Sequence, residues 1–73
     1  SNPIALGAIV TTLSSNGRET FFLVPGIGGI KLETEQGLLT VITSKSPIGS
    51  ELIGKRTGDR IQAGGGKSII RIS

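Results

Sequence analysis

Glycine interrupts this chain so often that it can form only short secondary-structure elements. Twelve of the 73 residues are glycine, and they separate short runs rich in β-branched side chains. Because glycine weakens strand interiors and favours turns, this spacing is typical of a small sheet with tight connections. A chain of this length also forms one domain at most, with a single modest core.

Five runs are predicted to be strands because apolar and β-branched residues lie between turn signals. The pair Asn16-Gly17 separates the first two runs and is a strong hairpin signal. Pro25-Gly26 ends the second run, and the stretch Gly26–Lys31 is interpreted as a flexible loop. The predicted strands cover residues 8–13, 19–24, 38–43, 60–63 and 67–72.

The character of the chain changes at Ser46, where the residues favour a short helix. Ser46 is a good N-cap, Pro47 suits the first helical position, and Gly54 suits the residue that ends a helix. A helix of about two turns is unstable alone, so its apolar face must pack against the sheet. The element order predicts an α+β fold with a small antiparallel β-sheet packing one short α-helix (order β-β-β-α-β-β). The apolar face of the helix consists of Ile48, Leu52 and Ile53.

The composition argues against several classes of function. The chain has no cysteine and no histidine, so it lacks the usual thiol and imidazole groups for catalysis or metal binding. Its net charge is +3, but the basic residues are scattered and the two phenylalanines lie in an apolar run. Direct nucleic-acid binding is therefore predicted to be weak or absent. We expect no enzymatic activity, no cofactor, no metal, no membrane association and a cytoplasmic location.

Two glycine-rich stretches resemble nucleotide-binding motifs without meeting their requirements. Gly64–Ser68 ends like a phosphate-binding loop, but Ile61 stands where another glycine is needed and a strand follows. The stretch Gly26–Lys31 has a lysine at the third glycine position of a dinucleotide fingerprint. The close carboxylates Glu33 and Glu35 are interpreted as solvated, with a weak Mg²⁺ contact left open.

The stretch Ser46–Asp59 resembles the signature of the C-terminal domain of GreA/GreB transcription elongation factors. It reads Ser-Pro-Ile-Gly-Ser-Glu-Leu-Ile-Gly-Lys-Arg-Thr-Gly-Asp, and the family shares the opening Ser-Pro, the central Gly-Lys and the closing Gly-Asp. The run Gly7–Thr11 also resembles the first strand of the family. The resemblance covers nearly the whole chain from Ile4 onward. Residues 3–73 are therefore interpreted as this domain, and residues 1–2 as an expression-tag remnant.

The resemblance implies an FKBP-like fold and a docking role. Gre factors restart backtracked bacterial RNA polymerase by stimulating its transcript cleavage, using acidic residues on a separate helical hairpin. This domain would anchor such a factor at the rim of the polymerase secondary channel. The residues implied to contact the polymerase are Ser44, Lys45, Ser46, Pro47 and Ile48. The residues implied to build the helix and the next turn are Leu52, Ile53, Gly54, Gly58 and Asp59.

Several alternatives remain open from the sequence. Lys45 stands where the family often has Asp, and Glu51 where Ala is usual, so the exposed helix face is also expected to differ. The chain could instead resemble a regulator of the nucleoside diphosphate kinase type, or another Gre paralogue that occupies the channel without stimulating cleavage. A prolyl isomerase would need an aromatic wall that two phenylalanines cannot form. An exposed edge strand could also pair with a second copy, so self-association is possible.

Overall fold

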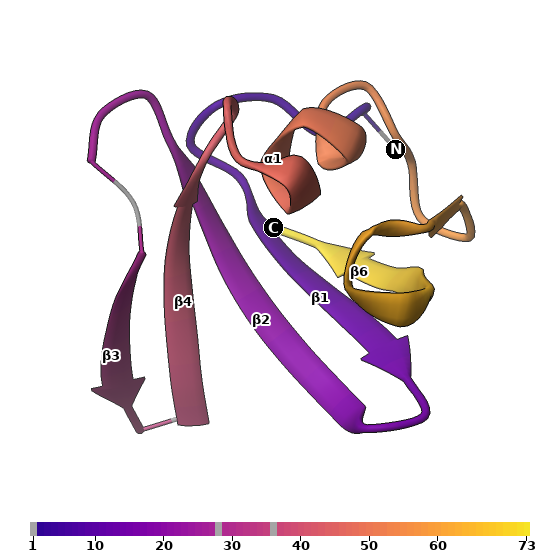
Figure 1. The fold of residues 1–73 in the computed structure, drawn as a ribbon, viewed down its shortest axis with the longest axis horizontal. Helices are drawn as coiled ribbons and strands as arrows, with labels where there is room; N and C mark the ends of the chain where they lie inside the picture. The colour runs from indigo at the N-terminus through magenta and orange to yellow at the C-terminus, as the bar shows by residue number, and fades with distance from the viewer. Residues whose placement is uncertain (1, 28, 36) are drawn as a thin grey trace.

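The computed structural model describes residues 2–27, 29–35 and 37–73, and in this part of the chain six strands form one sheet beside a short helix (Figure 1). The strand order is β3-β4-β2-β1-β6-β5. The α+β class predicted from the sequence is therefore confirmed. The elements are β1 (Ile9–Ser14), β2 (Gly17–Val24), β3 (Ile30–Thr34), β4 (Gly37–Thr43), α1 (Pro47–Leu52), β5 (Arg60–Ile61), the 3₁₀ turn η1 (Ala63–Gly65) and β6 (Lys67–Ile72).

Two tight hairpins appear where the sequence predicts them. β1 and β2 pair in antiparallel fashion, with Ser14 opposite Gly17. Gly17 adopts a φ of 100°, the conformation that glycine supplies at the end of a short hairpin loop. β5 and β6 form the second hairpin. β5 has two residues rather than the predicted four, because the chain turns into η1 after Gln62.

The sheet is mixed, which corrects the antiparallel sheet predicted from the sequence. β2 and β4 pair in parallel, with Leu23 opposite Ile42. The cause is β3, a strand that was not predicted from the sequence. Its first two residues, Ile30 and Lys31, lie at the end of the stretch Gly26–Lys31, which was expected to be a loop. The chain leaves β2, forms β3 at the sheet edge and returns as β4 antiparallel to β3. β4 therefore enters beside β2 in the same direction. Position 28 of the expected loop lies outside the described residues.

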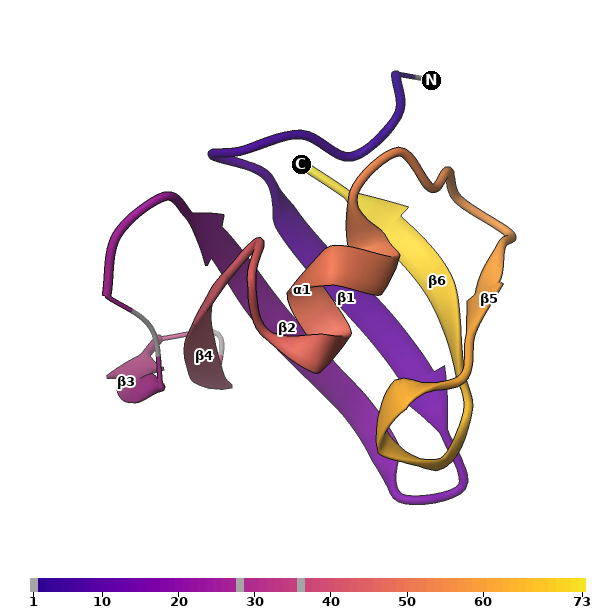
Figure 2. The ribbon, with the colours of Figure 1, turned by 45° about the horizontal axis from the view of Figure 1, so that its top comes forward.

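The core lies between α1 and the face of the sheet that this helix crosses (Figure 2). Leu52 is fully buried, as predicted, and Ile48 is partly buried against the core. The prediction for Ile53 is wrong, because its side chain is 40% exposed. α1 ends at Leu52, and Ile53 has a non-helical ψ of 128° that takes its side chain off the buried face. The buried core cluster comprises Ile4, Val10, Phe21, Leu23, Ile42, Leu52, Ile61 and Ile69.

Candidate functional site

The five residues predicted to contact a partner form the bend where β4 ends and α1 begins. We call residues 44–48 the β4–α1 corner; it lies at the upper end of β4 in Figure 1. Lys45 and Pro47 are exposed, whereas the other three residues are partly buried. Ile48 also packs against the core. The corner therefore offers chiefly Lys45 and Pro47 to a partner.

The hydroxyl of Ser46 is used within the corner itself. Its Oγ accepts a hydrogen bond from the Gly49 N–H at 3.0 Å and donates one to the Thr43 carbonyl at 2.7 Å. The Ser46 N–H donates to the same carbonyl at 3.1 Å. Ser46 is thus the N-cap that the sequence predicts, with Pro47 in the first turn. Its hydrogen bonds link the end of β4 to the start of α1 and fix the shape of the corner.

A close approach between the α1 backbone and the end of β4 sets the angle of the corner. A Cβ atom added to Gly49 would lie 1.9 Å from the Thr43 carbonyl oxygen and 2.9 Å from the Ser46 Oγ. No side chain fits there without moving the helix. Gly49 belongs to the motif Ser46–Asp59, but no role was predicted for it. The available signal was a glycine inside a short helix, which is normally unfavourable by about 1 kcal/mol relative to alanine.

Glu51 connects α1 to the glycine-rich turn before β6. Its Oε1 accepts a hydrogen bond from the Ala63 N–H at 2.7 Å, and its Oε2 accepts one from the Gln62 N–H at 2.9 Å. Hydrogen bonds to an ionised carboxylate are stronger than neutral ones. The expectation that position 51 merely alters an exposed helix face is therefore wrong. Glu51 is partly buried and stabilises the η1 turn.

The residues after α1 are held by backbone hydrogen bonds to the N-terminal segment. Gly54, with a φ of 82°, donates its N–H to the Ile4 carbonyl at 2.9 Å. The Ile4 N–H in turn donates to the Lys55 carbonyl at 2.8 Å. The Lys55 ammonium donates to the Glu51 carbonyl near the helix end at 3.1 Å, where a cation is favoured. Gly54 therefore ends the helix as predicted, and the segment around Ile4 packs beside it.

Gly58 and Asp59 close the turn that leads into β5. The Asp59 N–H donates to the Arg56 carbonyl at 3.0 Å, and the Asp59 Oδ2 accepts from the Arg56 N–H at 2.8 Å. Gly58 has a φ of 96°, which the third position of a type II turn requires. This pair has the structural role that the motif implies.

Lys67 is buried beneath the glycine-rich turn and forms an ion pair with Glu19 on β2. A Cβ atom at Gly64 would lie 2.7 Å from the Lys67 Cε, so the glycine makes room for the lysine. The chain continues as β6 rather than as a helix. The Lys67 ammonium therefore pairs with the half-exposed carboxylate of Glu19 in the same chain, in agreement with the prediction of a hairpin turn in place of a phosphate-binding loop.

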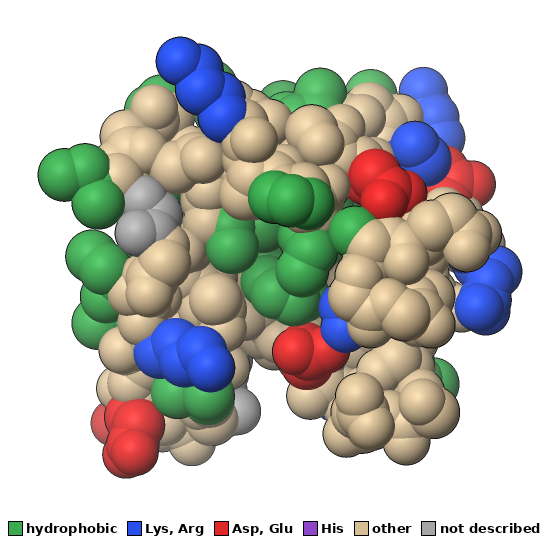
Figure 3. Space-filling view, viewed as in Figure 1, with side chains coloured by type: hydrophobic (Ala, Val, Ile, Leu, Met, Phe, Trp, Pro, Cys, Tyr) green, Lys and Arg blue, Asp and Glu red, His purple; other side chains and the backbone are tan. Residues whose placement is uncertain are grey.

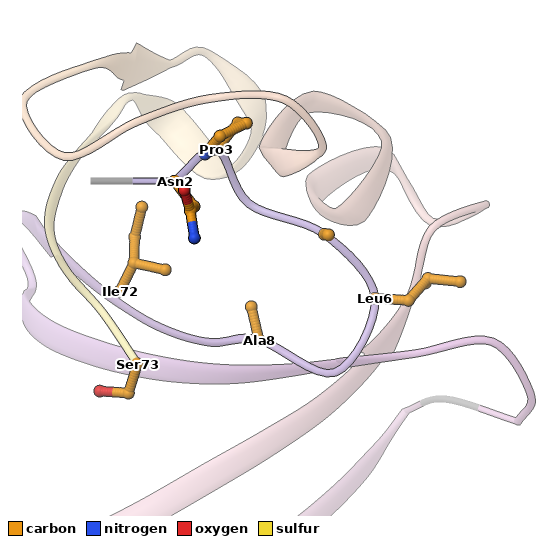
Figure 4. Close-up of a pocket in the computed structure, with 7 residues that line it drawn as sticks. Asn2, Pro3, Leu6, Ala8, Ile72 and Ser73 are labelled. Carbon is orange, nitrogen blue, oxygen red and sulfur yellow. The ribbon is translucent and has the colours of Figure 1, made fainter.

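Within the described residues, two open hollows lie outside the corner. The smaller, about 390 Å³, lies between the N-terminal segment and the end of β6, where Asn2, Ala8 and Ile72 border it and Leu6 points away (Figure 4). No ionisable side chain is among the residues that line it. The larger, about 960 Å³, lies over β1, β2, β4 and β6 and includes Arg18 and Arg71. Neither lining brings a histidine or cysteine to the cavity, since the chain has neither.

The described part of the chain was compared with the requirements of a metal-ion site and of a membrane-spanning helix. Within residues 2–27, 29–35 and 37–73, no three His, Cys, Asp or Glu side chains gather to hold a metal ion. Glu33 and Glu35 are both exposed, as predicted. None of the helical segments described is long and apolar enough to cross a bilayer.

Comparison of the chain with protein-family models, curated proteins and solved structures finds no match.

Proposed function

We propose that this chain is a docking module of the Gre type, which binds bacterial RNA polymerase at the rim of the secondary channel. The observation that supports this best is the construction of the β4–α1 corner. Ser46 and Gly49 lock its backbone, while Lys45 and Pro47 remain exposed. A preorganised surface loses little conformational entropy on binding. The corner is thus suited to docking onto a protein surface.

The motif Ser46–Asp59 supports the proposal because its residues act as one structural unit. Ser46 caps the helix, Gly49 allows the close approach to β4, and Asp59 closes the following turn. Ser46 and Asp59 are among the residues that the chain shares with the Gre signature, so the shared motif coincides with a single structural unit. An FKBP-like assignment rests on this unit and not on the strand order, because β3 and the parallel β2–β4 pairing depart from the expected sheet.

The charge at the corner indicates what the partner surface must supply. Lys45 is exposed, whereas the Lys55 and Lys67 ammonium groups contact the Glu51 carbonyl and Glu19 inside the domain. Complementary charge guides docking and suppresses wrong partners. We therefore propose that Lys45 meets an acidic group on the polymerase, in place of the contact made by the Asp that Gre factors often have.

The competing isomerase function is disfavoured by the placement of the aromatic residues. Phe21 is 2% exposed and belongs to the core, while its neighbour Phe22 lies on the opposite face of β2. Figure 3 shows a shallow hollow below α1 with hydrophobic side chains at its floor. Because Phe21 is buried and Phe22 faces the other way, the two rings do not form a wall for a proline ring.

Binding to purified bacterial RNA polymerase tests the proposal. We expect the chain to bind the core enzyme reversibly and to be displaced by an isolated fragment of the secondary-channel rim. We also expect no stimulation of transcript cleavage in backtracked complexes, since the acidic hairpin that performs this step in Gre factors has no counterpart in the described elements. A failure to bind polymerase would refute the docking role. If this chain stimulated transcript cleavage, the proposal that it only docks onto the polymerase would be refuted.

A further inference from the structure

The strand β3 forms a long free edge of the sheet. It is the terminal strand in the order β3-β4-β2-β1-β6-β5, and all five of its residues are exposed. Figure 1 shows it at one side of the molecule, paired with β4 alone. The opposite edge, β5, has only two residues. An exposed edge strand presents backbone groups that can pair with another strand.

We propose that β3 is a homodimerisation edge, at which a second copy of this chain pairs in antiparallel fashion about Leu32. A twofold axis midway between the two copies of Leu32 places Lys31 opposite the partner's Glu33, and Glu33 opposite the partner's Lys31. Leu32 then faces the partner's Leu32. Opposite charges across an antiparallel pair are favourable, and a twofold interface is complementary to itself. The sequence of β3 therefore matches its own copy.

The alternation of side chains also selects the register. If the equivalent faces of the two sheets align, the twofold axis must pass midway between two copies of the same β3 residue, because neighbouring residues point to opposite faces. A centre at Lys31 would place two lysines opposite each other, and a centre at Glu33 would oppose two glutamates. Like charges directly opposite each other are unfavourable. The centre at Leu32 avoids both conflicts.

The apolar side of β3 favours the same arrangement. Leu32 lies opposite Leu39 on β4 and Ile30 lies opposite Val41, so these residues share one face of the sheet. Leu32 and Ile30 are 47% and 49% exposed. Hydrophobic side chains are visible along the edge of the molecule that β3 forms, at the left of Figure 3. Pairing would extend this apolar row into a second copy and reduce the exposure of both residues.

Charge reversal with rescue tests the pairing directly. Analytical ultracentrifugation of the wild-type chain, at concentrations up to about 1 mM where even weak pairing is populated, should show a monomer–dimer equilibrium. Lys31→Glu or Glu33→Lys alone should raise the dissociation constant about tenfold, because each creates two like-charge pairs across the interface. The double variant carrying both changes should restore dimerisation. Lys45→Glu, an equal charge change at the corner, should leave it unaltered.

Each other outcome contradicts the proposal. A wild-type chain that stays monomeric throughout would show that the edge serves another partner or none. If neither single charge reversal changed the dissociation constant, or if the double variant did not regain dimerisation, the interface would lie elsewhere. If Lys45→Glu weakened dimerisation as much as Lys31→Glu, the change in net charge would explain the effect, and pairing along β3 would not be needed.

A single introduced cysteine tests the register independently, since the chain has no cysteine of its own. Residues directly opposite in an antiparallel pair have Cα separations within the range that a disulfide spans. Leu32→Cys should therefore form a disulfide-linked dimer under mild oxidation. Leu13→Cys is the matched control, because Leu13 is equally exposed at 45% but lies on the inner strand β1. Equal cross-linking of both variants, or none with Leu32→Cys, would overturn the proposed register.

Discussion

The β4–α1 corner and the strand β3 lie at the two ends of the β3–β4 segment. The corner exposes side chains, whereas β3 exposes the backbone of an edge strand. At the corner, Ser46 and Gly49 hold the backbone against the Thr43 carbonyl, and side chains face the solvent. At β3, five exposed residues depend on β4 alone for their pairing. The corner is thus built for recognition through side chains on a fixed backbone. The edge is suited to recognition through the backbone itself.

The largest difference is expected from truncating one leucine in α1, the helix that follows the corner, and one leucine in β3. Leu52→Ala should lower the free energy of unfolding by about 3 kcal/mol, because Leu52 is fully buried and its removal leaves a cavity. Leu32→Ala should lower it by about 1 kcal/mol or less in the monomer, since about half of the Leu32 side chain is already exposed to solvent. Urea denaturation at a concentration that keeps the chain monomeric measures both. Equal losses would show that β3 is as tightly packed as the helix.

Replacing a glycine by alanine compares how closely the backbone is packed near the corner and before β3. Gly49→Ala should destabilise the fold by about 2 kcal/mol, because its Cβ would overlap the Thr43 carbonyl and force α1 to shift. Gly26→Ala, in the connection before β3, meets no atom within 4 Å and should be nearly neutral. Thermal melts followed by circular dichroism compare the two variants. A neutral Gly49→Ala would mean that α1 moves freely against β4.

A smaller effect is expected from removing the helix cap. Ser46→Ala should lower the free energy of unfolding by about 1 kcal/mol, since it leaves the Gly49 N–H without its capping oxygen. Ser50→Ala is the matched control, because the Ser50 hydroxyl makes only an exposed contact with the Pro47 carbonyl at 3.1 Å. Chemical denaturation of the two variants separates them. Equal losses would remove the special role assigned to Ser46.

Features set by local backbone geometry could be predicted from the sequence. The hairpin at Gly17, the cap at Ser46 and the turn at Gly58 each depend on residues close in the chain. The α+β class followed from the order of such elements. The alternation of Ile30 and Leu32 with Lys31 and Glu33 was also a strand signal, but the neighbouring glycines led to the prediction of a loop.

Features set by tertiary contacts could not be predicted. The parallel pairing of β2 with β4 depends on where β3 lies, and nothing in either strand alone specifies its neighbour. The bidentate contact of Glu51 spans 11 and 12 residues, and the pairing of Lys67 with Glu19 spans 48. Within the corner, the sequence indicated the five residues but not their division into three partly buried residues and the two exposed positions, Lys45 and Pro47.

The most direct test of the proposed docking role is the affinity of a corner variant for bacterial RNA polymerase. The double variant Lys45→Ala/Pro47→Ala removes the two exposed side chains of the corner and leaves Ser46 and Gly49 in place. We expect its dissociation constant to rise about tenfold or more, a loss of roughly 1.4 kcal/mol of binding free energy, with urea denaturation confirming a folded domain. Arg18→Ala, at an exposed position near the start of β2 and away from the corner, should bind like the wild type. An unchanged affinity of the double variant, or an equal loss with Arg18→Ala, would contradict docking through the β4–α1 corner.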